Sequence, residues 1–287
     1  MWTEITREQY RREGLRYASD MTDAEWAMVE PFMPAVKRSG RPRKVDLRGV
    51  VEGLLYILRT ACPWRLLPHD FPNRSTVQRY FYAWRTDGLW KRINFVLLQQ
   101  AREQAGREAS PSGEVIDSQS VKTTESGGPR GGACPRARQS RDPGDAGKVN
   151  GRKRHIITDT TGLLVGAQVH RADIQDRDGA VGVLASIRYL FPWLRHVFAD
   201  DGYTGEKLET TLAGMGQWTL AIVKRPDQAT GFCLLPRRWV VERTFAWLGR
   251  NRRLAKDFEA TIGSAEAWLY LASVQLLARR FARSGCH

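Results

Sequence analysis

The stretch VIDSQSV at residues 115–121 decides the fold, because it places apolar β-branched residues directly before an aspartate. Val115 and Ile116 favour a strand, since such side chains fit a pleated and half-buried surface. An ionised aspartate inside an apolar strand is costly unless it is paired or bound to a cation. Asp117 is therefore predicted to be functional. The alternative is a strand-end residue that hydrogen-bonds to a turn.

Patterns of strands and helices continue after this stretch. Residues 154–159 and 163–170 predict a hairpin across a Thr-Thr-Gly turn, and the residues at 163, 165, 167 and 169 are expected to share one face. Together with the first strand, the predicted elements have the order of a ribonuclease H-like α/β fold, a mixed sheet with flanking helices. The later elements are strands at 196–199 and 218–223 and helices at 178–190, 206–213 and 266–281.

Helices dominate the part of the chain before this stretch. Asp46 can cap a helix over residues 47–60, and Asn73 or Ser75 can cap a helix that continues over residues 76–85. A helix, a connection and a second helix with exposed polar side chains favour a helix-turn-helix-like DNA-binding domain. Plain three-helix packing is the alternative.

The composition divides the chain into two domains. Residues 1–107 are predicted to be all-α, and the small and polar residues that follow mark a boundary before a second domain at 108–287. Within the second domain, residues 125–150 are rich in Gly, Arg, Pro and Ser and cannot build a core, so a flexible loop is expected there.

The charge balance limits the class of partner. In 287 residues, 45 Lys and Arg oppose 31 Asp and Glu, which gives a formal net charge of +14 and a pI of about 10.0. A protein this basic is expected to meet a polyanion; a solubility charge spread over the surface is the alternative. Scattered cysteines, the lack of a signal-peptide pattern and short apolar runs predict a cytoplasmic protein with no membrane partner.

Two more carboxylates stand in settings that suit metal binding. Asp200 directly follows the predicted strand at 196–199. It could instead cap a turn, and Asp201 competes with it for the ligand role. Glu242 lies on a predicted helix, on one stripe with Arg238, and an ordinary ion pair is its alternative role.

Together with Asp117, these residues could hold two divalent cations. Carboxylate oxygens are hard ligands that suit Mg²⁺, and two-metal phosphoryl transfer places the ions about 3.5–4 Å apart. We predict that Asp117 bridges both ions, that Asp200 binds one and that Glu242 binds the other. The same three residues are the predicted catalytic residues, with two Mg²⁺ ions as cofactors and Mn²⁺ as a substitute. Caps and turns are the expected roles of three other acidic residues, Asp173, Asp176 and Asp178.

Basic and polar side chains gather on the predicted recognition helix and around the carboxylates. A run of this kind is often a solvated face, but beside three candidate metal ligands phosphate contact is the stronger interpretation. The predicted DNA-binding residues are Arg41, Arg43, Lys44, Ser75, Gln78, Arg79, Arg152, Lys153, Arg154, Arg238, Arg250, Arg252 and Arg253.

Several blocks of the sequence carry a family resemblance. The blocks are VIDSQSVKTT at 115–124, KVNGRKRH at 148–155, ADIQDRDGA at 172–180, FAD at 198–200 and RWVVERTFAWL at 238–248. They resemble the insertion-sequence 5 family of bacterial DDE transposases. WRLLP at 64–68 and WRTDG at 84–88 are similar to the leading helical domain of that family.

The resemblance implies a ribonuclease H-like DDE catalytic domain in which Asp117, Asp200 and Glu242 form the metal-binding triad. It further implies binding of double-stranded DNA at terminal inverted repeats, 3′-end cleavage and strand transfer into target DNA. Pairing of two DNA ends implies a homodimer or a higher assembly. The resemblance also implies a protein that acts at the nucleoid in a bacterial cytoplasm.

The sequence departs from the family pattern in three places. Leu235 stands where a tyrosine is usual, Gly249 stands where a lysine or arginine is usual, and the loop at 132–145 is longer. An inactive DNA-binding transposase remnant or regulator is therefore the alternative function. A nuclease of the same fold without strand transfer is a further one.

Overall fold

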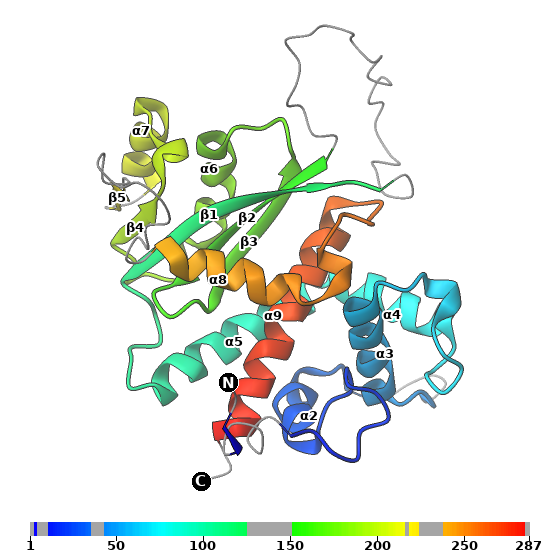
Figure 1. Cartoon of the computed structure of the whole chain (residues 1–287). Helices are drawn as coiled ribbons and strands as arrows, with labels where there is room; N and C mark the ends of the chain where they lie inside the picture. Colours follow the sequence, from blue (N-terminus) through cyan, green and yellow to red (C-terminus); the bar gives the residue numbers. More distant parts are fainter. Residues whose placement is uncertain are drawn as a thin grey trace, which may run out of the picture.

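A five-stranded mixed sheet lies at the centre of the structure, which is a computed structural model (Figure 1). The structure describes residues 3–4, 11–35, 43–124, 151–215, 218–223 and 238–284. The loop expected at 125–150, the DNA contact expected at Arg41 and the departure at Leu235 lie outside the described residues.

The strands confirm the predicted mixed sheet. Their order is β3-β2-β1-β4-β5. The hairpin strands β2 and β3 are antiparallel to their neighbours, whereas β4 and β5 run parallel to β1. The bounds are β1 (Gly113–Lys122), β2 (Gly151–Asp159), β3 (Leu164–Arg171), β4 (His196–Ala199) and β5 (Thr219–Ile222).

Each face of the sheet is covered by its own pair of helices (Figure 1). Because side chains alternate along a strand, Val115 and Ile116 of β1 enter different core clusters. Ile116 packs with residues of α6 and α7, and Val115 packs on the side of α8 and α9. The helices are α6 (Asp176–Ile187), α7 (Glu206–Met215), α8 (Arg238–Gly249) and α9 (Ile262–Ser284).

One prediction about β3 is wrong. Ala167 and Val169 pack on the α9 side, but Val165 packs with the α6 cluster. The register between β2 and β3 shifts between Ile157 and Thr158, as at a β-bulge. A bulge adds one residue to one strand and so turns the following side chains to the other face. The residues at 163, 165, 167 and 169 therefore do not share one face.

The N-terminal region is helical, as predicted. Asp46 caps α3 by accepting from the Arg48 and Gly49 backbone N–H groups, and Asn73 rather than Ser75 caps α4. The connection between α3 and α4 contains η2 (Trp64–Leu66) and is longer than the tight turn of a helix-turn-helix. The helices are α2 (Asp23–Val29), which η1 (Glu30–Phe32) follows, α3 (Leu47–Thr60), α4 (Arg74–Thr86) and α5 (Leu89–Gln104).

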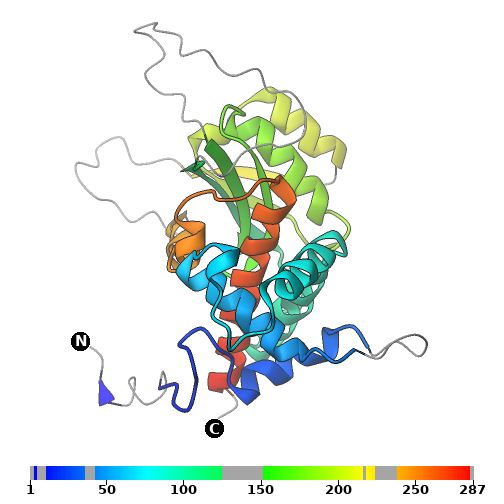
Figure 2. The same ribbon diagram turned by 90° about the vertical axis from the view of Figure 1, so that its right-hand side faces the viewer.

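Helix α9 joins the helical region to the sheet (Figures 1 and 2). Its Trp268 is fully buried and stacks on Phe81 of α4 at a ring-centroid distance of 4.3 Å. The same core cluster reaches Ile156 of β2 and Val169 of β3. The N-terminal helices and the sheet therefore share one continuous hydrophobic core. None of the helices described is both long enough and apolar enough to cross a membrane.

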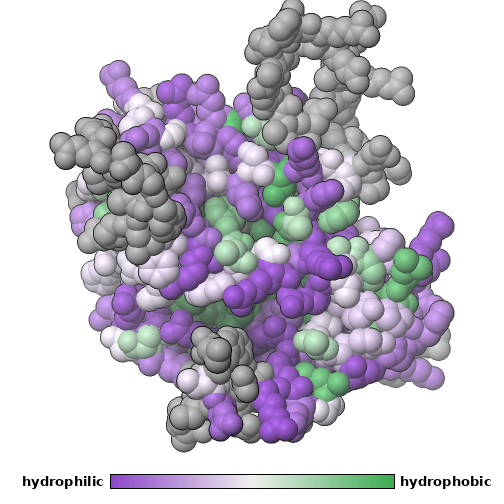
Figure 3. All heavy atoms as spheres, viewed as in Figure 1, coloured by the Kyte–Doolittle hydropathy of each residue, from purple (hydrophilic) through white to green (hydrophobic). Residues whose placement is uncertain are grey.

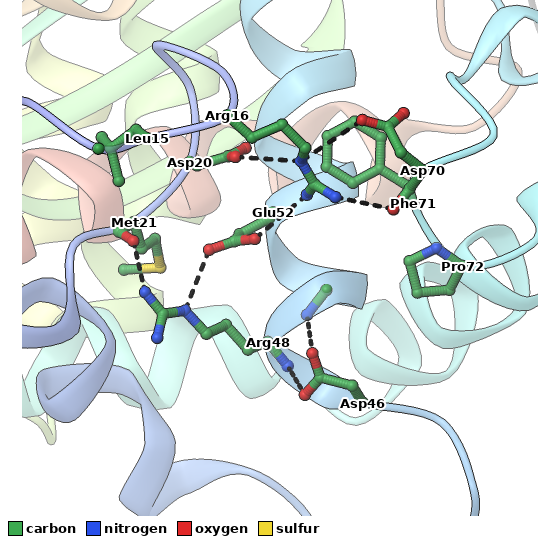
Figure 4. A pocket seen from close by; sticks show the side chains of 12 residues that line it. Leu15, Arg16, Asp20, Met21, Asp46, Arg48, Glu52, Asp70, Phe71 and Pro72 are labelled. Atoms are coloured by element: carbon green, nitrogen blue, oxygen red, sulfur yellow. Dashed lines mark hydrogen bonds and ion pairs between the residues drawn. The ribbon is translucent and has the colours of Figure 1, made fainter.

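A pocket of about 570 Å³ lies between α3 and the segment before α2 (Figure 4). Arg16 and Arg48 both face Glu52, at N–O distances of 3.4 and 3.1 Å. Arg16 also approaches Asp70 at 3.5 Å, and Arg48 donates to the Met21 carbonyl at 2.7 Å. These paired charges tie the segment before α2 to α3.

A buried ionic cluster lies under the start of β1. Arg102 of α5 pairs with Asp159 at the end of β2, and both side chains are buried. Glu114 is 0% exposed beside them, and its carboxyl oxygens have no hydrogen-bond partner among the described residues. Burial raises the pKa of Glu114 well above its ordinary value of 4.5, and the Asp159 charge raises it further against the opposing effect of Arg102.

This cluster predicts a pH-dependent stability. The unfolded chain releases the Glu114 proton near its ordinary pKa, whereas the folded protein keeps it to higher pH, so wild-type stability falls as the pH rises between the two values. Glu114→Gln removes that loss and should be more stable than wild type at pH 8 by about 1–3 kcal/mol, with a much smaller difference near pH 4.5. Urea unfolding at both pH values measures the effect. The exposed Glu103→Gln is the control. If the free energy of unfolding changed with pH in the same way for wild type and Glu114→Gln, a raised Glu114 pKa would be excluded.

Candidate active site

The sheet brings Asp117 and Asp200 together. Val115 of β1 pairs with Phe198 of β4 in a parallel ladder. Asp117 and Asp200 each lie two residues further along, past the last pair of this ladder, and the charges of both raise the pKa of the Tyr203 hydroxyl, so they lie near each other beyond the carboxyl end of β4. Val115 and Phe198 pack into the core on the α8 side, and alternation along β1 places Asp117 on that side too.

Backbone N–H groups orient both carboxylates. The Ser118 N–H donates to Asp117 Oδ1 at 2.7 Å, and the Gly202 N–H donates to Asp200 Oδ1 at 2.9 Å. Asp200 also begins η3 (Asp201–Tyr203) as its N-cap. Asp201 is exposed, which favours Asp200 as the partner of Asp117.

Asp176 is a third carboxylate at this place, although its sequence context predicts only a cap or a turn. Its Oδ1 accepts from Ser118 Oγ at 2.6 Å and lies 2.9 Å from Lys153 Nζ. Burial would raise the pKa of Asp176, but the hydrogen bonds and charge of these neighbours lower it. A Cβ added to Gly202 would lie 3.1 Å from Asp200 Oδ1 and 3.3 Å from Asp176 Oδ2. Asp176 therefore sits directly beside Asp200.

Tyr203 lies on the buried side of the candidate site. Its side chain is 1% exposed. Burial raises the pKa of the Tyr203 hydroxyl, and the charges of Asp117, Asp176 and Asp200 raise it further. The hydroxyl is thus neutral and close to all three carboxylates.

A pair of buried imidazoles lies next to Asp176. His155 Nδ1 lies 2.6 Å from His170 Nε2, and His155 Nε2 lies 3.6 Å from Asp176 Oδ1. Burial and the neighbouring His170 lower the pKa of His155 to about 3, so this ring is neutral at physiological pH. A Cβ added to Gly179 of α6 would lie 2.4 Å from His170 Nε2. Only a glycine there lets the first turn of α6 approach the imidazoles.

Glu242 is exposed on α8, the helix that crosses β1 and β2. Thr244 Oγ1 donates to the Gly162 carbonyl at 2.8 Å, and Arg243 Nη2 donates to the Thr161 carbonyl at 2.8 Å. The Arg243 guanidinium also lies between two aromatic rings of the same helix, those of Trp239 at 4.2 Å and Trp247 at 4.6 Å. These contacts fix α8 to the turn between β2 and β3.

The three predicted metal ligands are only partly assembled. Asp117 and Asp200 both lie near Tyr203, and α8 carries Glu242 over the β1 face on which Asp117 lies. Within the described ranges, however, no three Asp, Glu, His or Cys side chains lie close enough to hold one metal ion. The carboxylate oxygens of Asp117 and Asp200 are hard ligands of the kind that Mg²⁺ and Mn²⁺ prefer.

Three of the arginines predicted to bind DNA have buried roles instead. Arg152 pairs with Asp257 at 3.1 Å, and Arg154 donates to the Lys256 carbonyl at 3.2 Å. Arg253 pairs with Glu259 at 2.5 Å. Burial between β2 and the segment around η4 (Arg252–Leu254) leaves these guanidiniums 3–6% exposed. The structure thus differs from the phosphate contacts that the sequence predicted for them.

The other predicted DNA contacts have mixed exposure, and they stay predictions. Figure 3 shows mainly hydrophilic side chains over the face that carries α8. Arg43 and Gln78 are half-buried and donate to the Pro34 carbonyl and the Tyr82 hydroxyl, Lys153 faces Asp176, and Arg238 begins α8. The exposed side chains are those of Lys44, Ser75, Arg79, Arg250 and Arg252.

Aspartates on neighbouring parallel strands, with a glutamate on a helix over the same face, define the class of DDE enzymes with a ribonuclease H-like core. Residues 108–277 match the family model described as "Transposase DDE domain", and residues 21–94 match the one described as "Putative transposase of IS4/5 family". The first match spans more than half of the chain, so the protein belongs to the transposase DDE domain family.

Relatives from Burkholderia cepacia share part of the sequence. The chain is 30% identical over 122 residues to "Insertion element IS402 uncharacterized 16.2 kDa protein". This alignment covers 40% of this chain and 82% of the relative. It is 32% identical over 128 residues to "Putative transposase for insertion sequence element IS402", and this alignment covers 42% of this chain and 60% of the relative. The crystal structure of a pre-cleavage Mos1 transpososome is similar at 8% identity and a TM-score of 0.29, over 88% of this chain and 82% of that one. A TM-score this low does not support a residue-by-residue comparison.

Proposed function

We propose that this chain is the DNA transposase of an insertion sequence. In this proposal it binds the terminal inverted repeats, cleaves each end to free a 3′-hydroxyl and joins that hydroxyl to target DNA. The observation that carries the proposal is the parallel pairing of β1 with β4, beyond which Asp117 and Asp200 both lie near the Tyr203 hydroxyl. Membership of the transposase DDE domain family supports the same class of reaction.

Asp117, Asp200 and Glu242 would hold two divalent cations, Mg²⁺ or Mn²⁺, which supply an activated oxygen nucleophile and stabilise the leaving oxygen. Asp117 would bridge them. Because no three such side chains of the described residues lie close enough to hold one ion, the three proposed ligands have to draw closer together for this site to form.

The surrounding residues prepare the carboxylates for this role. The Ser118 and Gly202 N–H groups each hold one oxygen of Asp117 and Asp200 in place. The side chains of Arg243 and Thr244 hold α8, and with it Glu242, at the turn between β2 and β3. Oriented oxygens on Asp117 and Asp200 reduce the reorganisation that metal and DNA binding require of these two residues.

Double-stranded DNA is the proposed partner, both as inverted-repeat ends and as target. A net charge of +14 favours contact with phosphates. The proposed contacts in the described region are the exposed Lys44, Ser75, Arg79, Arg250 and Arg252. A homodimer or higher assembly in the bacterial cytoplasm would pair the two ends.

Joining of precleaved ends tests the proposed function. Short inverted repeats in the DNA that flanks the coding region supply the substrate. With a 3′-hydroxyl already present, the wild-type chain and Mg²⁺ should yield products in which the end is joined to a target plasmid. End cleavage without joined products would instead indicate a nuclease of the same fold. End binding with neither reaction, in Mg²⁺ or Mn²⁺, would indicate the inactive DNA-binding remnant or regulator.

A further inference from the structure

Asp176 touches the two residues whose backbone N–H groups orient the catalytic aspartates. Ser118 donates its N–H to Asp117 and its hydroxyl to Asp176 Oδ1. Gly202 donates its N–H to Asp200, and a Cβ added to Gly202 would lie 3.3 Å from Asp176 Oδ2. The Asp176 side chain on α6 thus lies next to both Ser118 and Gly202.

The position of Asp176 is fixed independently of any metal. Lys153 of β2 lies 2.9 Å from its Oδ1 and supplies a positive charge that balances the third carboxylate. The first turn of α6 lies on the His155–His170 pair, which Gly179 makes possible. His155 Nε2 is completely buried and lies 3.6 Å from Asp176 Oδ1.

The Tyr203 hydroxyl is a second buried polar group at the same point. The Ser118 side chain lies within hydrogen-bonding reach of this hydroxyl, and the charges of Asp117, Asp176 and Asp200 act on it. Tyr203 therefore approaches the same Ser118 side chain that donates to Asp176.

We propose that Asp176 is a positioning residue of the active site, which acts through Ser118 and Gly202 to hold Asp117 and Asp200 in metal-binding geometry. The inference rests on the proposed function, because it assigns Asp176 to the same metal site. Asp176 does so without joining the ligand set: its Oδ1 is engaged by Ser118 and Lys153. Residues that orient metal ligands from a second layer typically alter metal affinity by about 10–100-fold when replaced.

Mn²⁺ binding to the full chain without DNA tests this role. Free Mn²⁺ is measured by electron paramagnetic resonance for wild type, Asp176→Asn, Asp176→Ala and Asp117→Asn. Asp176→Asn keeps an oxygen acceptor for Ser118 but leaves the Lys153 charge unbalanced, so its Kd for Mn²⁺ should rise by about 10–100-fold. The exposed Asp173→Asn on the same segment is the matched control and should bind Mn²⁺ like wild type.

The outcomes separate this inference from the proposed function. A wild-type Kd in Asp176→Asn and Asp176→Ala, together with weak binding by Asp117→Asn, would overturn the positioning role and leave the metal site intact. Unchanged binding by Asp117→Asn would remove the metal site and the inference with it. If the Asp176 variants fail to fold in a thermal melt, Ser118→Ala decides: it cuts the link from Asp176 to β1 and should still weaken Mn²⁺ binding, whereas unchanged affinity would contradict the role.

Discussion

Asp117→Asn should lower the rate of DNA end cleavage by at least about a thousandfold, while binding of the DNA end stays within about twofold of wild type. A metal ion contributes several kcal/mol of transition-state stabilisation, and about 4 kcal/mol corresponds to a thousandfold in rate. Asparagine keeps the size of the side chain but removes the charge that would hold both cations. A labelled-end cleavage assay gives the rate, and a gel shift without divalent metal gives the binding.

The stability of Asp117→Asn shows whether the loss is chemical. Asp117, Asp176 and Asp200 are like charges that share one site, so removing one should leave the melting temperature equal to that of wild type or raise it. Ser120→Ala, an exposed change on the same strand, is the control for both assays. Strand transfer by Asp117→Asn at more than a tenth of the wild-type rate would overturn the assignment of this residue.

The neighbours Asp200 and Asp201 should behave very differently when each is changed to asparagine. Asp200→Asn should lower cleavage by about a thousandfold, for the same reason as at Asp117. Asp201→Asn should stay within about threefold of wild type, because its side chain is exposed in η3 and stands outside the register with Asp117. Asparagine is as good an N-cap as aspartate, so the turn at Asp200 should survive.

This pair of variants is its own control, since the two residues adjoin in sequence and differ in position. Cleavage rates for both are measured on the same labelled end at saturating protein. A large loss in Asp201→Asn with little loss in Asp200→Asn would move the proposed ligand to Asp201 and contradict the register argument.

Regular elements could be predicted from sequence because their signals are local. The helix expected over 47–60 has those bounds in α3, since Asp46 provides a cap and the apolar residues recur at helical spacing. The strand that carries Asp117 follows from its β-branched residues, although β1 extends further at both ends. The alternation of strands and helices after residue 113 then leaves few ways to arrange a mixed sheet.

The direction of individual basic side chains could not be predicted in the same way. Arg152 and Arg154 lie two apart on β2 and share its inner side, whereas Lys153 between them points to Asp176. A run of basic residues therefore contains both buried and accessible charges. Their partners, such as Asp257, are more than a hundred residues away in the chain, so no local pattern identifies them.

The role of Asp176 was missed for a related reason. The local sequence around Asp176 shows only an acidic residue at the start of a helix, which is a frequent cap position. Its contact with Ser118 spans 58 positions, and its proximity to Gly202 depends on how α6 lies on the sheet. The signal in the sequence is its place in the block ADIQDRDGA, one of the blocks that carry the family resemblance.

The most direct test of the central claim is the metal dependence of end cleavage by the wild-type chain, with Asp117→Asn on the same gel. The account predicts that a free 3′-hydroxyl appears at the transposon end with Mg²⁺ or Mn²⁺. It further predicts that this product is lost when a chelator removes the metal and is not formed by Asp117→Asn. Cleavage that persists in the chelator, or that Asp117→Asn performs at the wild-type rate, would contradict it.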